Sequence, residues 1–548
     1  MDTLFLATLG DMLVRGCVEQ PERTALVIDD RRWTYAQLHE RAVATARSLR
    51  GLGVRKGDHV AVFMPNCIEF LEVLFGATYL GAVTVPINAR FRIEELRHVV
   101  PDSGARVVLV NSTGEAASEH LDRLRDAFPA IDDAPVPDAD TPEVLQLDAA
   151  PTLRAVVAFG HESAPGVLGA KAFAALGDGV PADEVDHQRR RVALRDVAMM
   201  FYTSGTTSNP KGCPLTHEAL VRTGVTTRQR FGYRDGDVMF DPLPMFHTAS
   251  TQPMIATLDA LGTFVTMTHF EPTAALRLIA EEGVTVMFTA FPTITEALLN
   301  HPDYDPERTF VRVRSVFNVS APDHLRSMQA RMPHSTLVNA FGMTEFAGSV
   351  TMVDPAETLD LRVTQGLPLP GIEIEIRDPF GDPLPPGEMG EIVIRGPTMF
   401  EGYHNDPEKS AATIEPEGWW HSGDLGVLRP DGRLEFKGRM KDMLKVGGEN
   451  VAAIEIESHL QSHPAVNIAQ VVGVPDPKYG EVPAAFIELR PGATATAEEL
   501  IAHCQGRIAS FKVPRYIRFV TEWPMSSTKV QKYKLREQLH AELGLTSS

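Results

Sequence analysis

The sequence predicts an α/β protein in which mainly parallel sheets are covered by helices. Segments typical of strands and of helices alternate in the N-terminal part of the chain, with strands expected at 59–64 and 107–110. Thr34 and Gln37 have the spacing of a capping box, which predicts a helix that runs to Gly51. Alternation of this kind is typical of parallel sheets whose connections are helices.

The longest apolar stretch, 70–87, contains an acidic residue and ends in Val-Thr-Val-Pro. Asn66 and Glu69 before it also have capping-box spacing. We therefore expect a helix from about Cys67 to Leu80 and then a buried strand, rather than a membrane span.

The alternation resumes in the middle of the chain. A helix is expected from His217, a strand near Val238, a helix over 274–282 and a strand over 284–288. Residues 130–190 are rich in Asp, Pro and Ala and weakly periodic, so long loops are expected there.

The pattern changes from Leu367 to Gly438, where short alternating strands lie between turns such as Pro385-Pro386-Gly387. This pattern predicts a small antiparallel β-barrel or sheet. The rest of the chain mixes helix and strand character. We place a domain boundary near Lys441, which divides the chain into 1–440 and 441–548.

Length and composition narrow the function. A chain of 548 residues is too long for one core. Acidic residues exceed basic ones, 72 to 52, which gives a net charge of −20 and argues against nucleic-acid binding. Four scattered cysteines without metal-ligand spacing suit a reducing cytoplasm. The N-terminus lacks a basic region, so no signal peptide is expected.

The most informative stretch is Tyr202-Thr-Ser-Gly-Thr-Thr-Ser-Asn-Pro-Lys211, followed by Gly212. Backbone N–H groups, hydroxyls and a lysine in one short loop can bind phosphate oxygens. The stretch is a poor P-loop, because Pro210 stands at the second glycine position and Gly212 at the Ser/Thr position. We therefore expect a nucleotide triphosphate site of another kind.

Four later segments complete a recognisable set. They are Asn339-Ala-Phe-Gly-Met-Thr-Glu345, Trp420-His-Ser-Gly-Asp424, the segment from Gly438 to Asn450, and Pro524-Met-Ser-Ser-Thr-Lys529-Val-Gln-Lys532. In this order, the five segments resemble the motifs of the adenylate-forming superfamily of acyl-CoA synthetases, luciferases and nonribosomal-peptide adenylation domains. Gly447-Gly-Glu-Asn-Val451 and Lys529-Val-Gln-Lys532 are most similar to acyl-CoA synthetases.

The resemblance implies an N-terminal body of two doubly wound α/β subdomains plus a small antiparallel β-barrel, and a small mobile α+β C-terminal domain hinged at Lys441. It also implies a reaction. A carboxylic acid and MgATP form acyl-AMP and pyrophosphate, and coenzyme A then displaces AMP to give the thioester. The expected partners are the acid, ATP, Mg²⁺ and coenzyme A. The sequence leaves open whether the chain forms a homodimer.

The resemblance also assigns the nucleotide site. The β- and γ-phosphates would be held by Thr203, Ser204, Gly205, Thr206, Thr207 and Lys211, and the α-phosphate by Thr344. Glu345, with Thr203, would bind Mg²⁺, which prefers oxygen ligands. Phe341 would stack on adenine and Asn339 would bind its amino group. Asp424 would accept from the ribose hydroxyls, with Arg439 beside it. Further nucleotide or thiol contacts are expected from Ser320, Ala321, Pro322, Ala340, Gly342, Met343, Lys445, Gly447 and Gly448.

Lys529 is the expected catalytic cation between the substrate carboxylate and the α-phosphate. The chain departs from the family here, because Thr528 replaces the usual glycine before this lysine. His247 resembles a gating or positioning residue at the acyl site, whereas we expect His421 to be structural.

The acyl pocket is expected at 247–251, 319–322 and 340–343, which contain small or apolar residues and no Arg or Lys. A second carboxylate would lack a cation there, so malonate-like acids are disfavoured. We expect a medium-length, branched, alicyclic or aryl monocarboxylate, with a medium-chain fatty acid as the first guess. Transfer to a carrier-protein thiol in trans and a non-catalytic binding relative remain alternatives. No carrier segment is expected after residue 540.

Overall fold

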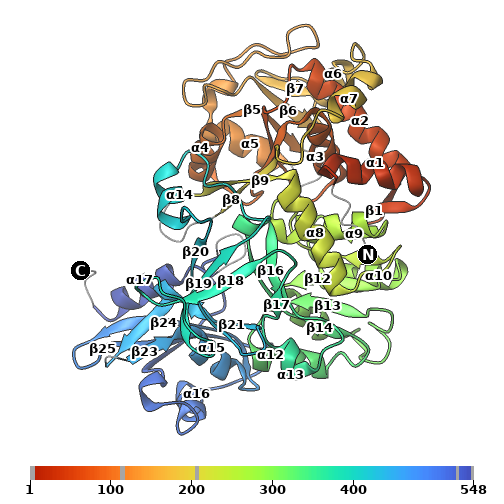
Figure 1. Ribbon diagram of the computed structural model, residues 1–548. Helices are drawn as coiled ribbons and strands as arrows, with labels where there is room; N and C mark the ends of the chain where they lie inside the picture. Colours follow the sequence, from red (N-terminus) through yellow and green to blue (C-terminus); the bar gives the residue numbers. More distant parts are fainter. Residues whose placement is uncertain (1–6, 112–117, 204–208, 448, 526–529, 545–548) are drawn as a thin grey trace.

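The structure is a computed structural model that describes residues 7–111, 118–203, 209–447, 449–525 and 530–544. Figure 1 shows three parts: an α/β subdomain in red to orange at the top, a second in green at the lower right, and the C-terminal part in blue at the lower left. Small antiparallel sheets lie between them.

The first large sheet has seven strands in the order β7-β6-β5-β3-β4-β8-β9, parallel throughout except for the β8–β9 pair. Its strands are β3 (His59–Phe63), β4 (Val83–Pro86), β5 (Ala105–Asn111), β6 (Ala155–Phe159), β7 (Val167–Gly169), β8 (Val197–Thr203) and β9 (Lys211–Thr216). The predicted strands at 59–64 and 107–110 are confirmed as β3 and β5.

The prediction of long loops over 130–190 is confirmed for 132–154, which contain no helix or strand. It was wrong for the rest, because 155–190 supply β6 and β7, and also the helices α6 (Ala170–Ala175) and α7 (Ala182–Arg189). Strand β6 is Ala-Val-Val-Ala-Phe and is almost entirely buried. A short strand buried on both faces carries no polar alternation, so periodicity could not reveal it.

The second large sheet also has seven strands, in the order β14-β13-β12-β10-β11-β1-β2, and only β1–β2 is antiparallel. Its strands are β1 (Thr24–Ile28), β2 (Arg31–Thr34), β10 (Val238–Phe240), β11 (Thr263–Thr266), β12 (Val286–Ala290), β13 (Ser315–Asn318) and β14 (Thr336–Val338). An N-terminal hairpin thus completes the sheet of the second subdomain.

Helices separate and cover the two sheets. One core contains residues from the facing sides of both sheets and from the helices between them, which include α1 (Leu9–Glu19), α2 (Tyr35–Gly51), α3 (Ile68–Leu80), α8 (His217–Phe231) and α9 (Thr248–Asp259). A second core lies under α4 (Ile93–Asp102) and α5 (Ser118–Ala127). A third lies under α10 (Pro272–Glu281), α11 (Pro292–Leu299) and α12 (Pro322–Ala330). Among the described residues, no helix has both the length and the apolar character needed to cross a membrane.

The two predicted capping boxes have different outcomes. At α2 the prediction is confirmed, because the Thr34 hydroxyl accepts from the Gln37 N–H and the Gln37 amide accepts from the Thr34 N–H. At α3 it was wrong, because Cys67 is the N-cap and makes no side-chain cap bond. Spacing alone could not show that Asn66 has tertiary partners.

Asn66 instead joins the two subdomains. Its amide nitrogen donates to the backbone oxygens of Leu243 at 2.8 Å and Met267 at 3.2 Å, and to the Thr266 hydroxyl at 3.1 Å. Its amide oxygen accepts from the Met245 N–H at 2.8 Å. The residue is only 3% exposed, so these bonds replace water at a buried junction.

The region after β14 forms two antiparallel sheets. One consists of β15 (Ala340–Met343), β16 (Gly348–Met352) and β17 (Leu367–Pro368). The other runs in the order β18 (Glu373–Arg377), β19 (Met389–Arg395), β20 (Trp420–Leu428) and β21 (Leu434–Arg439). A bridge between Gly366 and Leu434 links them. The pairing order is open, so the region forms sheets, one of the two forms expected, rather than a closed barrel.

The C-terminal part is an α+β unit that begins just after the short helix Met440–Asp442. Its strands are β22 (Met443–Val446), β23 (Glu449–Ala452), β24 (Val466–Asp476), β25 (Gly480–Leu489) and β26 (Tyr516–Phe519). Helices α15 (Ala453–Gln461), α16 (Ala497–Cys504) and α17 (Lys532–Glu542) pack against them. Lys441, the expected hinge, lies in the short helix that precedes this unit.

A buried carboxylate connects the body to the C-terminal unit. Glu296 of α11 lies 2.8 Å from Arg331, 3.0 Å from His324 and 3.5 Å from Arg490 of the C-terminal unit. Burial opposes its ionisation, but His324 and the arginines lower the pKa of Glu296 to about 2. Arg331 and His324 belong to the body, so the Glu296 carboxylate keeps two partners if Arg490 moves away.

We predict that Asn66→Ala lowers the free energy of unfolding by about 2–4 kcal/mol, because buried backbone groups of the second subdomain lose their partners. Denaturant titration measures this change. The matched control is Asn467→Ala, a half-buried asparagine beside Glu488, which should cost under about 1 kcal/mol. Equal effects would show that the junction depends on other contacts.

We predict that Glu296→Gln destabilises the protein by about 3 kcal/mol at pH 7. The folded pKa of Glu296 lies below its ordinary 4.5, so its contribution is complete above pH 4.5 and is lost as the pH falls toward about 2. Denaturation midpoints between pH 7 and 2.5 should therefore converge for variant and wild type. The control is Glu307→Gln at the exposed pair with His334. A gap that stays constant with pH would contradict this assignment.

Candidate active site

One large cleft brings the predicted segments together. Its volume is about 3070 Å³, and its lining includes Thr203, Lys211, 340–345 and 420–424. Strands β8, β12 and β13 end at this cleft, with Thr203, Ala290 and Val319 at or just beyond their last residues. A crevice beyond the carboxyl ends of parallel strands is the usual ligand position in an open α/β sheet.

The two ends of the predicted phosphate loop are held side by side. Thr203 is the last residue of β8, and Lys211 is the first residue of β9 and its register partner. The Lys211 Nζ lies 3.4 Å from the Asp406 carboxylate and 5.6 Å from the centre of the Tyr403 ring. Ser204, Gly205, Thr206 and Thr207 lie outside the described residues.

Glu345 lies in a short helix, Thr344–Phe346, directly after β15. Its Oε1 accepts a hydrogen bond from the Tyr403 hydroxyl at 2.9 Å. Burial and the nearby Glu345 charge raise the pKa of Tyr403, so this hydroxyl keeps its proton and remains a donor. Tyr403 thus contacts both Glu345 and Lys211. Sequence reasoning missed it, because no motif spacing relates it to either residue.

The predicted adenine residues lie at different depths. Phe341 stacks on Phe436 with ring centres 5.7 Å apart and an interplanar angle of 29°, and both line the cleft. Asn339 is fully buried, and its amide donates to the backbone oxygen of Thr364 at 2.9 Å. The Asn339 amide therefore binds the segment just before β17, and its contact with adenine remains a prediction.

Asp424, the residue expected to bind ribose, lies within β20, where the pairing with β19 is interrupted. Its carboxylate lies 3.6 Å from the Arg439 guanidinium, and the two residues are register partners across β20 and β21. Asp424 and Arg439 both line the cleft, and their contact with ribose remains a prediction.

The predicted acyl residues line another part of the same cleft. His247 is the N-cap of α9, and its ring packs against Phe246 with centres 4.7 Å apart. Phe288 and Phe317 are stacked, with centres 3.9 Å apart and planes 5° apart. The remaining wall contains Ala249, Gln252, Val319, Ser320, Ala321, Pro322, Ala340, Gly342 and Met343. Aromatic and small side chains therefore dominate this region.

Gln252 is a buried polar residue in the acyl wall. It is 2% exposed, donates to the Thr227 hydroxyl and accepts from the Ser349 N–H at 3.0 Å. Because protein groups already use both ends of its amide, Gln252 adds a fixed polar surface to the pocket and no charge.

Lys445 and Gly447, which were expected to contact the nucleotide or the thiol, do not line the cleft. Lys445 and Gly447 lie on the β22–β23 hairpin, where their N–H groups bind Glu481 at 3.0 Å and the Tyr479 oxygen at 2.7 Å. Gly448 and Lys529 lie outside the described residues. Met525 and Val530, on either side of the Lys529 segment, pair with each other and line the cleft.

Comparisons with known proteins agree with this arrangement. Residues 13–404 match the AMP-binding enzyme family, and residues 455–529 match the AMP-binding enzyme C-terminal domain. The chain is 33% identical over 556 residues to the putative acyl-CoA synthetase YngI of Bacillus subtilis (strain 168), with 100% of both chains covered. It is 32% identical over 538 residues to a feruloyl-CoA synthase of Amycolatopsis sp, covering 97% of this chain and 99% of that protein.

The chain is also similar to a solved structure of a CoA ligase. The anthranilate CoA ligase AuaEII in complex with anthranoyl-AMP aligns with a TM-score of 0.86 and 27% identity, covering 98% of each chain. The family match spans both the body and the C-terminal unit, and the relatives align over nearly their full lengths. The chain therefore belongs to the AMP-binding enzymes of the adenylate-forming superfamily, and within it to the acyl-CoA synthetase family.

Proposed function

We propose that this chain joins a monocarboxylic acid, preferably an aryl or medium-length one, to coenzyme A through an acyl-adenylate. The observation that carries the proposal is the convergence of Thr203, Lys211, Glu345 and Asp424 on one cleft that also has an aromatic acyl wall. These residues come from three separate segments of the chain, 202–211, 339–345 and 420–424. Their convergence argues for catalysis rather than for a non-catalytic binding relative.

The first step joins two anions. A carboxylate oxygen attacks the α-phosphorus of ATP, and the bond from that phosphorus to pyrophosphate breaks. Lys211 would compensate charge on the outer phosphates and Lys529 charge at the reacting centre. In the second step the sulfur of coenzyme A attacks the acyl carbon, its proton is lost, and the carbon–oxygen bond to AMP breaks. AMP is a better leaving group than hydroxide, which is why the adenylate is made.

The residues present fit a magnesium ion. Glu345 offers a carboxylate and Thr203 a hydroxyl at the same cleft, and Mg²⁺ usually takes one or two carboxylates with phosphate oxygens. The Tyr403 bond to Oε1 fixes the orientation of Glu345. When bound, Mg²⁺ would neutralise phosphate charge.

We assign the two steps to two placements of the C-terminal domain, 441–548. Met525 and Val530, which flank residues 526–529 in the chain, line the cleft, whereas Lys445 and Gly447 do not. This placement supports adenylation. The second step would follow a rotation about Lys441 that brings the β22–β23 hairpin, with Lys445 and Gly447, to the cleft.

The acid is proposed from the pocket and the relatives. Phe288 and Phe317 offer flat apolar surfaces, and Ala249, Ala321 and Ala340 leave room beyond an acetyl group. Two of the relatives are named for ferulate and anthranilate, which are aryl acids. Because the cysteines are free and scattered, we place the reaction in a reducing cytoplasm.

The test is a coenzyme A-dependent AMP-release assay with acetate, malonate, hexanoate, palmitate, benzoate, ferulate and cyclohexanecarboxylate. The highest kcat/KM should fall among the aryl, alicyclic and medium-length acids, with related acids within about 10–200-fold of one another. A maximum with acetate or malonate would overturn the substrate class. AMP release that coenzyme A does not stimulate would favour a carrier-protein acceptor.

Lys529→Ala should reduce adenylation by at least about a thousandfold, because the carboxylate and the α-phosphate lose their shared cation. Thioester formation from synthetic acyl-AMP and coenzyme A should stay within about tenfold of wild type. The matched control is Lys532→Ala, whose ammonium already pairs with Glu457 at 2.6 Å. That variant should retain adenylation. Equal losses in both half-reactions for Lys529→Ala would show that the lysine is misassigned.

A further inference from the structure

Strand β20, which carries Asp424, contains a bulge that is unpaired on the side of β19. Val393 on β19 pairs with His421 on β20, and Glu391 pairs with Leu425. Residues 422–424 therefore stand opposite Ile392 alone. A bulge of this kind leaves backbone groups without ladder partners and is a common way to aim a side chain.

Side chains take over the hydrogen bonds that the bulge removes. Glu391 accepts from the Gly423 N–H through Oε1 at 3.0 Å, and the Ser422 hydroxyl accepts from the Asp424 N–H at 3.0 Å. The Ser422 hydroxyl also donates to the Ile392 oxygen at 2.5 Å. Gly423 has a φ of +67°, a conformation that glycine adopts without strain. Glu391 and Ser422 thus fix the backbone on each side of Gly423.

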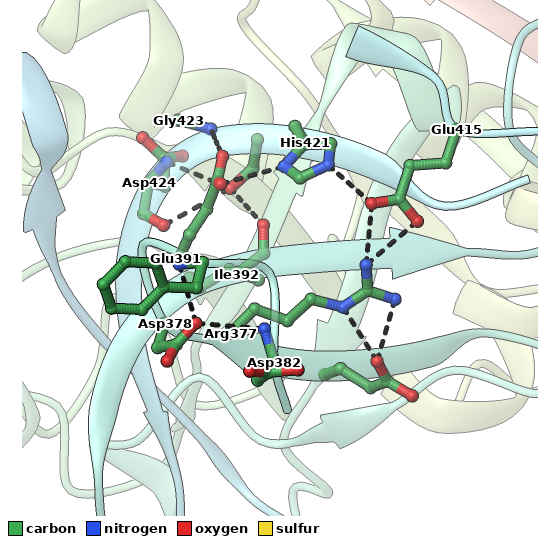
Figure 2. Close-up of polar contacts among 12 residues, drawn as sticks. Arg377, Asp378, Asp382, Glu391, Ile392, Glu415, His421, Gly423 and Asp424 are labelled. Atoms are coloured by element: carbon green, nitrogen blue, oxygen red, sulfur yellow. Dashed lines mark hydrogen bonds and ion pairs between the residues drawn. The ribbon is translucent and has the colours of Figure 1, made fainter. Parts of the chain in front are cut away.

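Glu391 is itself held by a chain of opposite charges, shown in Figure 2. Its Oε2 lies 2.9 Å from His421 Nδ1, and His421 Nε2 lies 2.9 Å from Glu415 Oε1. Glu415 in turn accepts two bonds from Arg377 at 2.7 and 2.9 Å, and Arg377 lies 5.0 Å from the Trp419 ring centre.

This network gives His421 a role that the sequence did not suggest. Burial opposes its protonation, but Glu391 and Glu415 on its two sides raise the pKa of His421 overall. A protonated ring donates to both carboxylates, so Glu391 has one preferred orientation. Its Oε1 is then available to the Gly423 N–H.

We propose that Glu391 is a positioning residue for ATP, holding the Ser422–Asp424 bulge so that the Asp424 carboxylate meets the ribose hydroxyls. This inference rests on the proposed function, because it needs Asp424 to bind ribose. Glu391 acts through Gly423 and Asp424 rather than on the reacting atoms. Its loss should therefore weaken ATP binding selectively.

Two variants separate the hydrogen bond from the charge. Glu391→Ala removes the acceptor of the Gly423 N–H, so KM for ATP should rise about tenfold while KM for the acid and for coenzyme A stays within twofold. Glu391→Gln keeps an amide oxygen for Gly423 and should restore KM for ATP to within about threefold of wild type. A purely structural role would move all three KM values together and would not be rescued by glutamine.

A double-mutant cycle with Asp424→Ala tests the route of action. Asp424→Ala should raise KM for ATP, and adding Glu391→Ala to it should change KM for ATP by less than about twofold, because the residue being positioned is gone. Glu373→Ala is the matched control, an exposed carboxylate of the same antiparallel sheet paired with Arg395 at 2.7 Å. It should leave KM for ATP unchanged. Unfolding temperatures verify that each variant is folded.

The outcomes are distinguishable. If Asp424→Ala binds ATP normally, the ribose assignment of the proposed function fails. The positioning role fails, and the proposed function stands, if Asp424→Ala weakens ATP binding but Glu391→Ala does not. The same conclusion follows if Glu391→Ala adds its full effect to that of Asp424→Ala in the double variant. Should Glu391→Ala not fold, Glu391→Met keeps the stem without the acceptor. It must show the same selective rise in KM for ATP, and a normal KM would equally overturn the role.

Discussion

Charge pairing around the cleft is the constraint on which the rest of the site depends. The proposed reaction places a substrate carboxylate and a triphosphate close to acidic side chains such as Glu345 and Asp424. The protein itself already has a net charge of −20. The structure meets this with local pairs. Lys211 lies beside Asp406, and Arg439 lies beside Asp424. His421 lies between the Glu391 and Glu415 carboxylates, which raise its pKa. Unpaired charges at such a site would cost more than they contribute.

The fold brings the members of these charge pairs together from separate segments of the chain. Parallel strands of both large sheets end at the cleft, and the antiparallel region supplies Glu345, in the short helix between β15 and β16, and Asp424 of β20. Asn66 closes the junction between the two subdomains with four hydrogen bonds. Glu296 links the body to the C-terminal unit through Arg490, while its other partners keep it compensated. An ion pair with Arg490 that can break without leaving the Glu296 charge unpaired suits the proposed rotation of the C-terminal domain.

Sequence patterns predicted the elements whose signals are local. The α2 capping box, β3, β5 and the helix at His217 were found because spacing or periodicity marks them. The residues of the cleft motifs came instead from the resemblance of five segments to a known superfamily. The patterns failed where contacts with residues far away in the chain determine the role of a residue or segment. Asn66 has the spacing of a cap but binds backbone groups of another subdomain. Strand β6 is buried on both faces and shows no alternation. Tyr403 and Glu391 contact site residues that lie far away in the chain, so no motif includes them.

The most direct measurement follows the oxygen atoms of the acid. The preferred acid is labelled with ¹⁸O in both carboxylate oxygens and turned over with ATP and coenzyme A, and AMP, pyrophosphate and thioester are then weighed by mass spectrometry. Because the attacking oxygen becomes the bridge of the acyl-adenylate and leaves with AMP, each AMP should carry one ¹⁸O and pyrophosphate none. Unlabelled AMP, or label in pyrophosphate, would contradict an acyl-adenylate and with it the account of this cleft.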